Sequence, residues 1–537
     1  MFILLDGEAL ETTVAIAGGI GFFLLGMAVM TDGLKALAGS ALRTVLARAT
    51  ATSLSGTVWG AVVTLLVQSS SATTMTTIGL VSAGLLSFPQ GLSLVFGANI
   101  GTTGTGWLVA LLGVRISLTA YALPIIFVGA LLKLMGKGRW AASGSASAGF
   151  ALILVGLTTL QQGMSGLAEQ LQPADLPAVL GAPGVPWGPG VLGLLALVGT
   201  GIVMTTVMQS STAAITITIS ALFAGAIGLD QALALVIGQN IGTSTSSAMA
   251  AIGASNTAKR LAVAYIAFKL IAAVVALVLF PVTARLMLRA AETVDPVTLV
   301  AAYHTAYNVV GVAILLPLIG PFTRVIERIV PERGSTFTGY LDPAALVASP
   351  IVAIEAARRT VAQVLKVLCS ADPAVVGASD ALQQVHGFLS KVTEPLPSED
   401  ERQWFIDTLH ALDHTIQLAA AIEEGAAVKA ALDGPEERRA VQLYEDAMRS
   451  AAEGAAVLEH AVAPADATRA RPVDHLARCS GELADLRARY RQTALDSVAS
   501  GTLTASDAMA NVDAVRLLDR RAHHAWRAVA YLAGVAA

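Results

Sequence analysis

The first 333 residues alternate between long apolar stretches and short polar breaks. A helix of roughly 17–25 apolar residues spans the hydrocarbon core of a bilayer. We expect such spans at residues 14–32, 91–112, 118–135, 145–162, 231–253, 260–286 and 299–321. Two further segments, 54–86 and 190–227, contain a polar break, and we interpret each as a helical hairpin that enters and leaves on one side. The pattern predicts an all-α membrane domain over residues 1–333.

The pattern changes after Arg333. Residues 334–341 read as a linker that begins rich in Gly, Ser and Thr, and residues 342–537 are charged and amphipathic. Apolar positions recur there at helical spacing, as they do in helix bundles. Helix start signals stand at Asp342-Pro343, Asp372-Pro373, Ser398, Pro435, Pro472 and Thr504. We therefore expect a bundle of about six helices, in two groups of three.

Composition supports a membrane assignment for the first part. Hydrophobic residues make up 55% of the 537 residues and charged residues 13%, and only seven charged side chains lie between Ser53 and Gly253. A soluble fold could not cover its surface with so few charges. The two cysteines, Cys369 and Cys479, lie in the polar part without ligand-spaced partners, which argues against a disulfide scaffold or a zinc site. The N-terminus lacks a basic region, so we expect no cleaved signal peptide.

An internal repeat determines the class of protein. Residues 68–103 read QSSSATTMTTIGLVSAGLLSFPQGLSLVFGANIGTT, and residues 209–244 read QSSTAAITITISALFAGAIGLDQALALVIGQNIGTS. The two segments align without a gap over 36 positions, of which 17 are identical. The polar residues match best, whereas chance similarity between apolar segments matches Leu, Ala and Val. The domain is therefore a duplicated unit.

Each copy places polar residues between apolar runs. A backbone group without a partner costs several kcal/mol in hydrocarbon, so such breaks persist where they line a cavity within the protein. Paired interruptions in two halves of a chain point to a transporter binding site. The alternative is that the Ser, Thr and Gly residues serve close helix packing. We favour a binding site for the motif cores and leave the flanking threonines open between the two.

The basic residues predict an orientation. Lys35, Arg43 and Arg48 follow the first span and acidic residues precede it, which places the N-terminus outside. The 163–189 loop, which contains no Lys or Arg, then lies outside, and the cluster that ends at Arg333 lies inside. Arg115, Arg285 and Arg289 are exceptions and fall outside. The hairpins open to opposite sides in this scheme, so the repeats are inverted, as alternating access requires.

The motif residues suit an anion and a cation together. A hairpin with a polar tip directs the N-terminus of its second helix, with its unpaired N–H groups, toward the middle of the membrane, where it can bind an anion. The hydroxyls of residues 69–71 and 210–212 add donors. Sodium takes oxygen ligands, and the second motif offers Asn99, Thr102, Asn240 and Thr243. No Lys or Arg lies in either motif, so anion recognition would rest on dipoles, hydroxyls and the bound cation.

QSSS and QSST, paired with GANIGTT and GQNIGTS, resemble the motifs of the bacterial sodium/phosphate cotransporter family, which is related to the animal type II renal phosphate carriers. The resemblance covers roughly residues 10–330. It implies sodium-driven uptake of inorganic phosphate, with Na+ as the coupling ion and no cofactor. The implied phosphate-binding residues are Gln68, Ser69, Ser70, Ser71, Gln209, Ser210, Ser211 and Thr212. The implied sodium-binding residues are Ser70, Asn99, Thr102, Thr103, Ser211, Asn240, Thr243 and Ser244.

Two polar residues of the later spans stand apart from the motifs. In this family a motif similar to His-x-x-Phe-Asn follows the second repeat, and here His304 and Asn308 keep its ends with Tyr307 in place of Phe. His304 could relay a proton or be a structural, hydrogen-bonded histidine. Lys269 falls inside the 260–286 span, where a charge either serves function or only orders helices. Both roles stay open.

Residues 342–537 resemble the PhoU-like domain, a regulator of bacterial phosphate uptake, in their helical architecture and in the stretch from Asp513 to His524. Such domains bind metal through acidic residues four apart on facing helices. Asp519 with His523, and His410 with His414, have that spacing, but the carboxylate pattern is incomplete. The alternative is a solvated helix face, so metal binding is left unassigned.

Three functions remain to be weighed. Sodium-coupled phosphate uptake leads, followed by sodium-coupled transport of another small anion, and then by a membrane phosphate sensor that signals through the bundle. An enzyme or ATP-driven pump lacks its motifs. We expect a multi-pass protein of the bacterial inner membrane with a cytoplasmic C-terminal domain. Its partners would be phosphate, Na+ and the lipid bilayer, with no nucleic acid, and a homodimer is compatible with the sequence.

Overall fold

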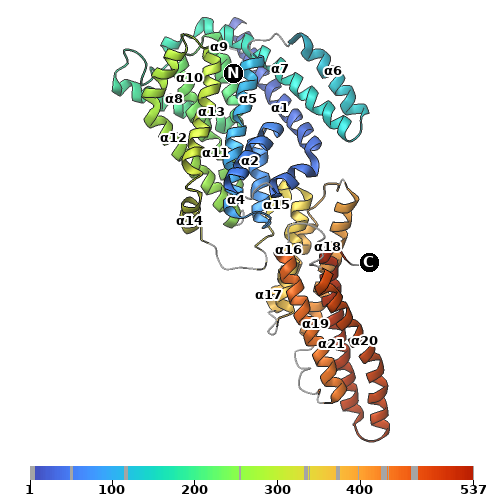
Figure 1. Cartoon of the computed structure of the whole chain (residues 1–537). Coiled ribbons are helices and arrows are strands. Elements are labelled where there is room, and N and C mark those ends of the chain that lie inside the picture. Colours follow the sequence, from blue (N-terminus) through green and yellow to red (C-terminus); the bar gives the residue numbers. More distant parts are fainter. Residues whose placement is uncertain are drawn as a thin grey trace. The chain divides into compact units, whose positions relative to one another are not determined.

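The computed structural model describes residues 7–48, 52–113, 119–252, 256–331, 337, 339–370, 375–396, 398–424, 432, 434–460 and 470–535. Helices and connecting segments make up all of this described part, without a strand. The chain divides into two compact units (Figure 1). The first comprises Met1–Ile78 and Ser87–Pro331, and the second comprises Gly79–Leu86 and Glu332–Ala537.

The first half of the first unit contains the first motif copy. Its elements are α1 (Gly7–Arg48), α2 (Ser53–Val67), α3 (Ser70–Ser82), α4 (Phe88–Gly101), α5 (Thr103–Leu108), a π-helical turn (Val109–Gly113), α6 (Thr119–Met135) and α7 (Arg139–Gln170). The two longest helices of this half, α1 and α7, pack along each other, and α6 packs on α7 (Figure 1). α2 packs on α4, so the first motif lies on neighbouring helices.

The second half repeats the central pattern of the first. Its elements are a short 3₁₀ turn (Pro173–Asp175), α8 (Trp187–Met208), α9 (Ser211–Ala224), α10 (Leu229–Gly242), α11 (Ser244–Ala250), α12 (Asn256–Ala290), α13 (Pro296–Leu315) and α14 (Ile319–Ile329). α8, α9, α10 and α11 correspond in order to α2, α3, α4 and α5. α12 and α13 contact both α4 and α10, and thereby join the two copies.

Glycines allow the helices of each copy to pack closely. A Cβ atom at Gly97 of α4 would lie 1.9 Å from the carbonyl oxygen of Thr57 on α2. At the matching position of α10, a Cβ at Gly238 would lie 2.0 Å from the carbonyl oxygen of Val198 on α8. Small residues that bring backbones together are typical of helix packing in membranes. The two copies are therefore alike in packing as well as in sequence.

Six helical segments of the described residues are long and apolar enough to cross a membrane. They are Glu8–Ala38, Phe88–Leu111, Arg139–Gln170, Trp187–Met208, Asn256–Ala290 and Pro296–Leu315. This confirms the expected all-α, multi-pass membrane protein. The predicted spans 14–32, 145–162 and 260–286 lie inside α1, α7 and α12, and 91–112 runs through α4, α5 and the π-helical turn.

Three predicted segments differ from the structure. The predicted span 231–253 is divided at Thr243 into α10 and α11, and the 14 residues of α10 rise only about 21 Å, against a core of roughly 30 Å. α8, expected as one arm of the 190–227 hairpin, is 22 residues long and can cross alone, because its apolar run is unbroken. The predicted span 299–321 runs past the end of α13 at Leu315 into α14.

The second unit is a helical bundle. Its helices are α15 (Pro343–Ala348), α16 (Pro350–Leu368), α17 (Val375–Leu389), α18 (Glu399–Glu424), α19 (Pro435–His460), α20 (Ala470–Ala499) and α21 (Ala505–Ala533). α19, α20 and α21 pack on one another, and α18 packs on α21 (Figure 1). The first helix expected from Asp342-Pro343 is divided at Ser349, because Pro350 cannot continue it.

Candidate functional site

Both QSS motifs begin with a glutamine in the left-handed backbone conformation. α2 ends at Gln68, with φ 57° and ψ 27°, and α8 ends at Gln209, with φ 50° and ψ 23°. Of the non-glycine residues that the structure describes, these two alone have a positive φ. This conformation costs roughly 1–2 kcal/mol for a residue with a side chain. Backbone strain of this kind is concentrated at binding and catalytic sites.

The two glutamine side chains make equivalent hydrogen bonds. Each Nε2 donates to the carbonyl oxygen three residues earlier, at 2.5 Å for Gln68 and 2.6 Å for Gln209. The Oε1 of Gln68 accepts from Oγ1 of Thr105 at 2.6 Å, and the Oε1 of Gln209 accepts from Oγ of Ser246 at 3.0 Å. Thr105 and Ser246 each follow their glutamine by 37 residues. Each glutamine thus links the break in the hairpin to the helix that follows the second break.

A helix begins directly after each glutamine. The hydroxyl of Ser69 accepts from the amide of Ala72 at 3.2 Å at the start of α3, and the hydroxyl of Ser210 accepts from the amide of Ala213 at 3.2 Å at the start of α9. The other N–H groups of each first turn have no partner within their helix. Such a helix start has a partial positive charge and can bind an anion. Ser70 and Thr212 are half-buried there, Ser211 is buried and Ser71 is exposed.

The second motif interrupts α4 at Thr102 and α10 at Thr243. At each break two hydroxyls donate to carbonyl oxygens of the preceding helix. These bonds are Thr102 to Ala98 at 2.9 Å, Thr103 to Ile100 at 2.8 Å, Thr243 to Gln239 at 3.0 Å and Ser244 to Ile241 at 2.7 Å. A hydroxyl that donates its proton in this way keeps its lone pairs for a cation.

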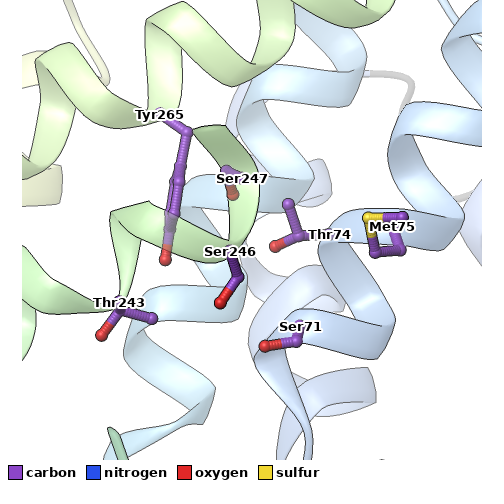
Figure 2. Close-up of a pocket in the computed structure, with 7 residues that line it drawn as sticks. All are labelled: Ser71, Thr74, Met75, Thr243, Ser246, Ser247 and Tyr265. Atoms are coloured by element: carbon purple, nitrogen blue, oxygen red, sulfur yellow. The ribbon is translucent and has the colours of Figure 1, made fainter. Parts of the chain in front are cut away.

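A small pocket lies between the two motif copies. Its lining residues are Ser71, Thr74 and Met75 of α3, Thr243 at the break, Ser246 and Ser247 of α11, and Tyr265 of α12. In Figure 2 the hydroxyls of Ser71, Thr74 and Ser246 face the space between α3 and α11, and Tyr265 of α12 lies beside α11. The cavity volume is about 20 Å³, room for about one water molecule. α3 and α11 must therefore separate before a larger guest can bind.

α12 reaches the asparagine of each copy. The phenol of Tyr265 donates to Oδ1 of Asn99 at 3.4 Å, and the ammonium of Lys269 donates to Oδ1 of Asn240 at 3.1 Å. Both asparagines are buried, and each amide nitrogen donates to the carbonyl four residues earlier. Because Tyr265 and Lys269 are four residues apart, they lie on one face of α12.

α13 contributes buried polar atoms that the hydrogen bonding of the described residues leaves unused. His304 and Asn308 are 2% and 1% exposed. Among the residues that the structure describes, His304 Nδ1 and Asn308 Oδ1 have no hydrogen-bond partner, although Asn308 Nδ2 donates to the carbonyl of His304 at 2.9 Å. His304 and Asn308 lie one helical turn apart in the interior. Buried polar atoms normally have hydrogen-bond partners, so the two unused atoms are unusual.

The structure brings some of the predicted residues together and separates others. Of the implied phosphate and sodium residues, Ser71 and Thr243 line the common pocket, and Gln209 reaches it through Ser246. Sequence reasoning missed Thr105 and Ser246, although both carry a hydroxyl at the position two residues beyond the aligned repeat. Tyr265 and Lys269 stand where a second copy of the His-x-x-Phe-Asn motif would have His and Asn, and the sequence left the role of that copy open.

The histidines of the second unit contact one another and aromatic side chains. Asp519 forms an ion pair with Arg487 at 2.7 Å, and His410 stacks on Tyr531. His414 Nδ1 lies 3.0 Å from His524 Nδ1, so one ring donates to the other. The described residues contain no group of three His, Cys, Asp or Glu side chains that could hold a metal ion.

Protonation at this contact is unfavourable. Burial, together with the neighbouring His524, lowers the pKa of His414 to about 4. Burial also lowers the pKa of His523 and of His524. Both rings of the 3.0 Å pair are therefore neutral at pH 7, which is the state in which one nitrogen can accept.

Residues 22–162 and 194–299 match the protein family described as Na+/Pi-cotransporter. The chain is 30% identical over 312 residues to the uncharacterized protein YqeW of Bacillus subtilis (strain 168), covering 58% of this chain and 96% of YqeW. It is 27% identical over 416 residues to the "Putative inorganic phosphate export protein YjbB" of Escherichia coli (strain K12), covering 76% of this chain and 71% of YjbB.

A shorter similarity links the chain to an animal protein. It is 31% identical over 109 residues to the sodium-dependent phosphate transport protein 2B of Homo sapiens, covering 20% of this chain and 16% of that protein. No solved structure matches the chain. Both motif copies lie within the matched ranges, which confirms the resemblance seen in the sequence. The chain belongs to the Na+/Pi-cotransporter family.

Proposed function

We propose that this protein is a sodium-coupled symporter that takes inorganic phosphate into the cell. The observation that carries the proposal is the paired strain at Gln68 and Gln209. Each glutamine ends one helix just before another begins, and bonds to the helix that follows the second break of its own copy. Two equivalent breaks of this kind suit a transporter, because the two halves of a transporter can alternate in exposing one site.

Phosphate would bind at the start of α3 and the matching start of α9. The unpaired first-turn N–H groups and the hydroxyls of Ser69, Ser70, Ser71 and Ser210–Thr212 supply donors. Phosphate oxygens accept such bonds strongly, and the helix dipole adds to the attraction. Thr74 of α3 would add a donor from the pocket wall, whereas the hydroxyl of Ser246 on α11 gives its proton to Gln209. Gln68 and Gln209 would position these groups as well as contact the anion.

Sodium would bind at the second breaks. The hydroxyl oxygens of Thr102, Thr103, Thr243 and Ser244 keep lone pairs for a cation, since their protons are committed to carbonyls. The Oδ1 atoms of Asn99 and Asn240 are further hard ligands, and Ser70 and Ser211 would complete the set from α3 and α9. A cation beside the anion lowers the cost of placing either in a site surrounded by hydrocarbon.

The direction of transport depends on the coupling. Moving a divalent phosphate inward against 100 mV, negative inside, costs about 4.6 kcal/mol. Each sodium that enters down a tenfold gradient and the same potential returns about 3.7 kcal/mol. Two sodium ions therefore suffice for the divalent anion, and one suffices for the monovalent anion, whose entry costs about 2.3 kcal/mol. Without sodium the potential drives the anion outward. Export is therefore the second candidate, favoured by the similarity to YjbB.

We also propose that the two motif copies have inverted orientations, and that residues 342–537 form a cytoplasmic PhoU-like regulatory domain. The basic residues that cluster before the second unit support the cytoplasmic placement. Its packed helices support a bundle of this kind. The membrane would then be the bacterial inner membrane.

Labelled phosphate uptake into proteoliposomes tests the proposal. An inward sodium gradient is compared with equal potassium and choline gradients at a clamped potential. We expect uptake with sodium alone. Vesicles loaded with labelled phosphate, under an inside-negative potential and without sodium, test export. Sodium-independent efflux without sodium-driven uptake would reject symport in favour of export, and movement of sulfate in place of phosphate would reject the substrate.

A further inference from the structure

Lys269 carries a charge that the surrounding protein does not neutralise. It is 3% exposed, and in the described part of the first unit no other Lys, Arg, Asp or Glu is as deeply buried. Its Nζ donates to Oδ1 of Asn240 at 3.1 Å and lies 5.6 Å from the ring centre of Tyr265. None of the ion pairs formed by the described residues includes it. A buried, unpaired ammonium is costly, so its retention indicates a role.

The equivalent asparagine of the first copy has a neutral partner. The side-chain amide nitrogen of Asn99 donates to the carbonyl four residues earlier at 2.8 Å, and that of Asn240 makes the same bond at 3.2 Å. Both turn Oδ1 toward α12. Asn99 meets the phenol of Tyr265 at 3.4 Å, and Asn240 meets the ammonium of Lys269. The two copies therefore agree in geometry and differ by one positive charge.

The position of that charge matches what a coupling ion would need. An ammonium is a compact cation that seeks oxygen acceptors, as sodium does. Asn240 lies one turn before Thr243, which lines the pocket, and Tyr265 lies one turn before Lys269 and lines the same pocket. The ammonium lies 5.6 Å from the ring centre of Tyr265, a residue of the pocket wall. A sodium ion at Asn240 would meet a like charge on the same oxygen.

We propose that Lys269 is a tethered cation that occupies the place of a coupling ion in the second copy. The sodium site at Asn99 is then open and the one at Asn240 is filled by the protein itself. The transporter consequently binds one sodium ion fewer than two equivalent sites would. The ammonium also supplies positive charge beside the anion, which neither motif contains. The inference rests on the proposed sodium-coupled symport and specifies its ion count.

The test is to count sodium ions in variants of the full-length protein. Lys269→Met removes the charge and keeps the length of the side chain, Lys269→Gln removes it and keeps polarity, and Lys269→Arg keeps the charge. Equilibrium binding of labelled sodium to purified protein in detergent gives ions per chain. The ratio of labelled sodium to labelled phosphate taken up by proteoliposomes gives ions per cycle.

We expect Lys269→Met and Lys269→Gln to bind one more sodium ion per chain than the unmodified protein, and Lys269→Arg to bind the same number. Where the neutral variants transport, the sodium-to-phosphate ratio rises by one. An unchanged sodium count in neutral variants that melt at the temperature of the unmodified protein overturns the inference. Failure of the unmodified protein to take up phosphate with sodium overturns the symport proposal instead, and the binding count distinguishes the two failures.

Discussion

Replacing Gln209 tests whether the left-handed glutamine serves the backbone or the site. Three variants separate the two roles. Gln209→Gly removes the side chain and relieves the strained conformation, whereas Gln209→Ala removes the side chain and keeps the strain. Gln209→Asn keeps an amide and tolerates the left-handed region, but its shorter side chain cannot reach Ser246 as Gln209 does at 3.0 Å.

The magnitudes follow from the contacts. Each variant loses the bond to Ser246 and the bond to the carbonyl three residues earlier, at about 0.5–1.5 kcal/mol each. The left-handed conformation costs a residue with a side chain about 1–2 kcal/mol, which glycine regains. Glycine gives back about 0.4–1 kcal/mol through the greater freedom of the unfolded chain. Gln209→Gly should therefore be as stable as Gln209→Ala, or more stable by up to about 1.5 kcal/mol.

Phosphate transport should not follow the order of stability, because all three variants lose the same side-chain contact. Without the Gln209–Ser246 bond, the start of α9 is no longer held to α11, and the loss of one positioning bond of about 1.4 kcal/mol weakens phosphate binding about tenfold. We expect all three variants to lose at least this much in apparent phosphate affinity. The assays are thermal unfolding in detergent and labelled phosphate uptake with an inward sodium gradient. Normal uptake by Gln209→Gly would refute a role for the side chain and leave only its backbone conformation.

Two further predictions concern packing and pH. Gly238→Ala should lower the melting temperature and reduce uptake, because its Cβ would lie 2.0 Å from the carbonyl oxygen of Val198 and overpacking costs about 1–3 kcal/mol. The control Gly199→Ala on α8 meets no atom within 4 Å and should stabilise by up to about 1 kcal/mol, so equal effects of the two would contradict the packing argument. Because burial lowers the pKa of His414 to about 4 in the folded protein, below its ordinary value near 6.5, the α18–α21 contact should be fully stable above about pH 6.5 and weaken as the pH falls toward 4. Hydrogen exchange of α18 and α21 in the full-length protein, corrected for intrinsic rates, measures this between pH 7.5 and 5. His414→Gln should reduce the dependence, and His523 and His524, whose pKa values are also lowered, should account for the remainder. Equal protection of the unmodified protein at both pH values would show that His414 does not titrate at the contact.

Several features of the site could be predicted from the chain alone because they are written in local patterns. The repeat appears as matched polar residues in apolar runs, and such residues have few roles in a membrane. The breaks at Gln68 and Gln209 follow from it, whereas the breaks at Thr102 and Thr243 lie inside segments that were predicted as single spans. The all-α class follows from apolar runs of membrane-spanning length in the first unit and from apolar positions at helical spacing in the second.

Boundaries were less predictable where helices end without a strong signal. The apolar run 231–253 reads as one span, yet it is divided at Thr243, whose backbone stays in the ordinary helical region. The break therefore lies in hydrogen bonding and packing and leaves no Pro or Gly-Pro signature in the sequence. α8 differs in the opposite direction. The sequence predicted one arm of a hairpin from residue 190, but the helix runs without a break from Trp187 to Met208 and ends at Gln209.

The sequence by itself determined the class of protein, the duplication and the residue types of the site, because apolar length, helical period and repeated motifs are properties of neighbouring residues. Only the tertiary structure decided which groups meet. Ser71 of one copy and Ser246 of the other share a pocket, and α12 brings Tyr265 to Asn99 across 166 residues of chain. It also decided that Lys269 reaches Asn240, a contact that depends on how α10 and α12 pack. The left-handed glutamines belong here too, since intrinsic preference opposes that conformation and only surrounding contacts can hold it.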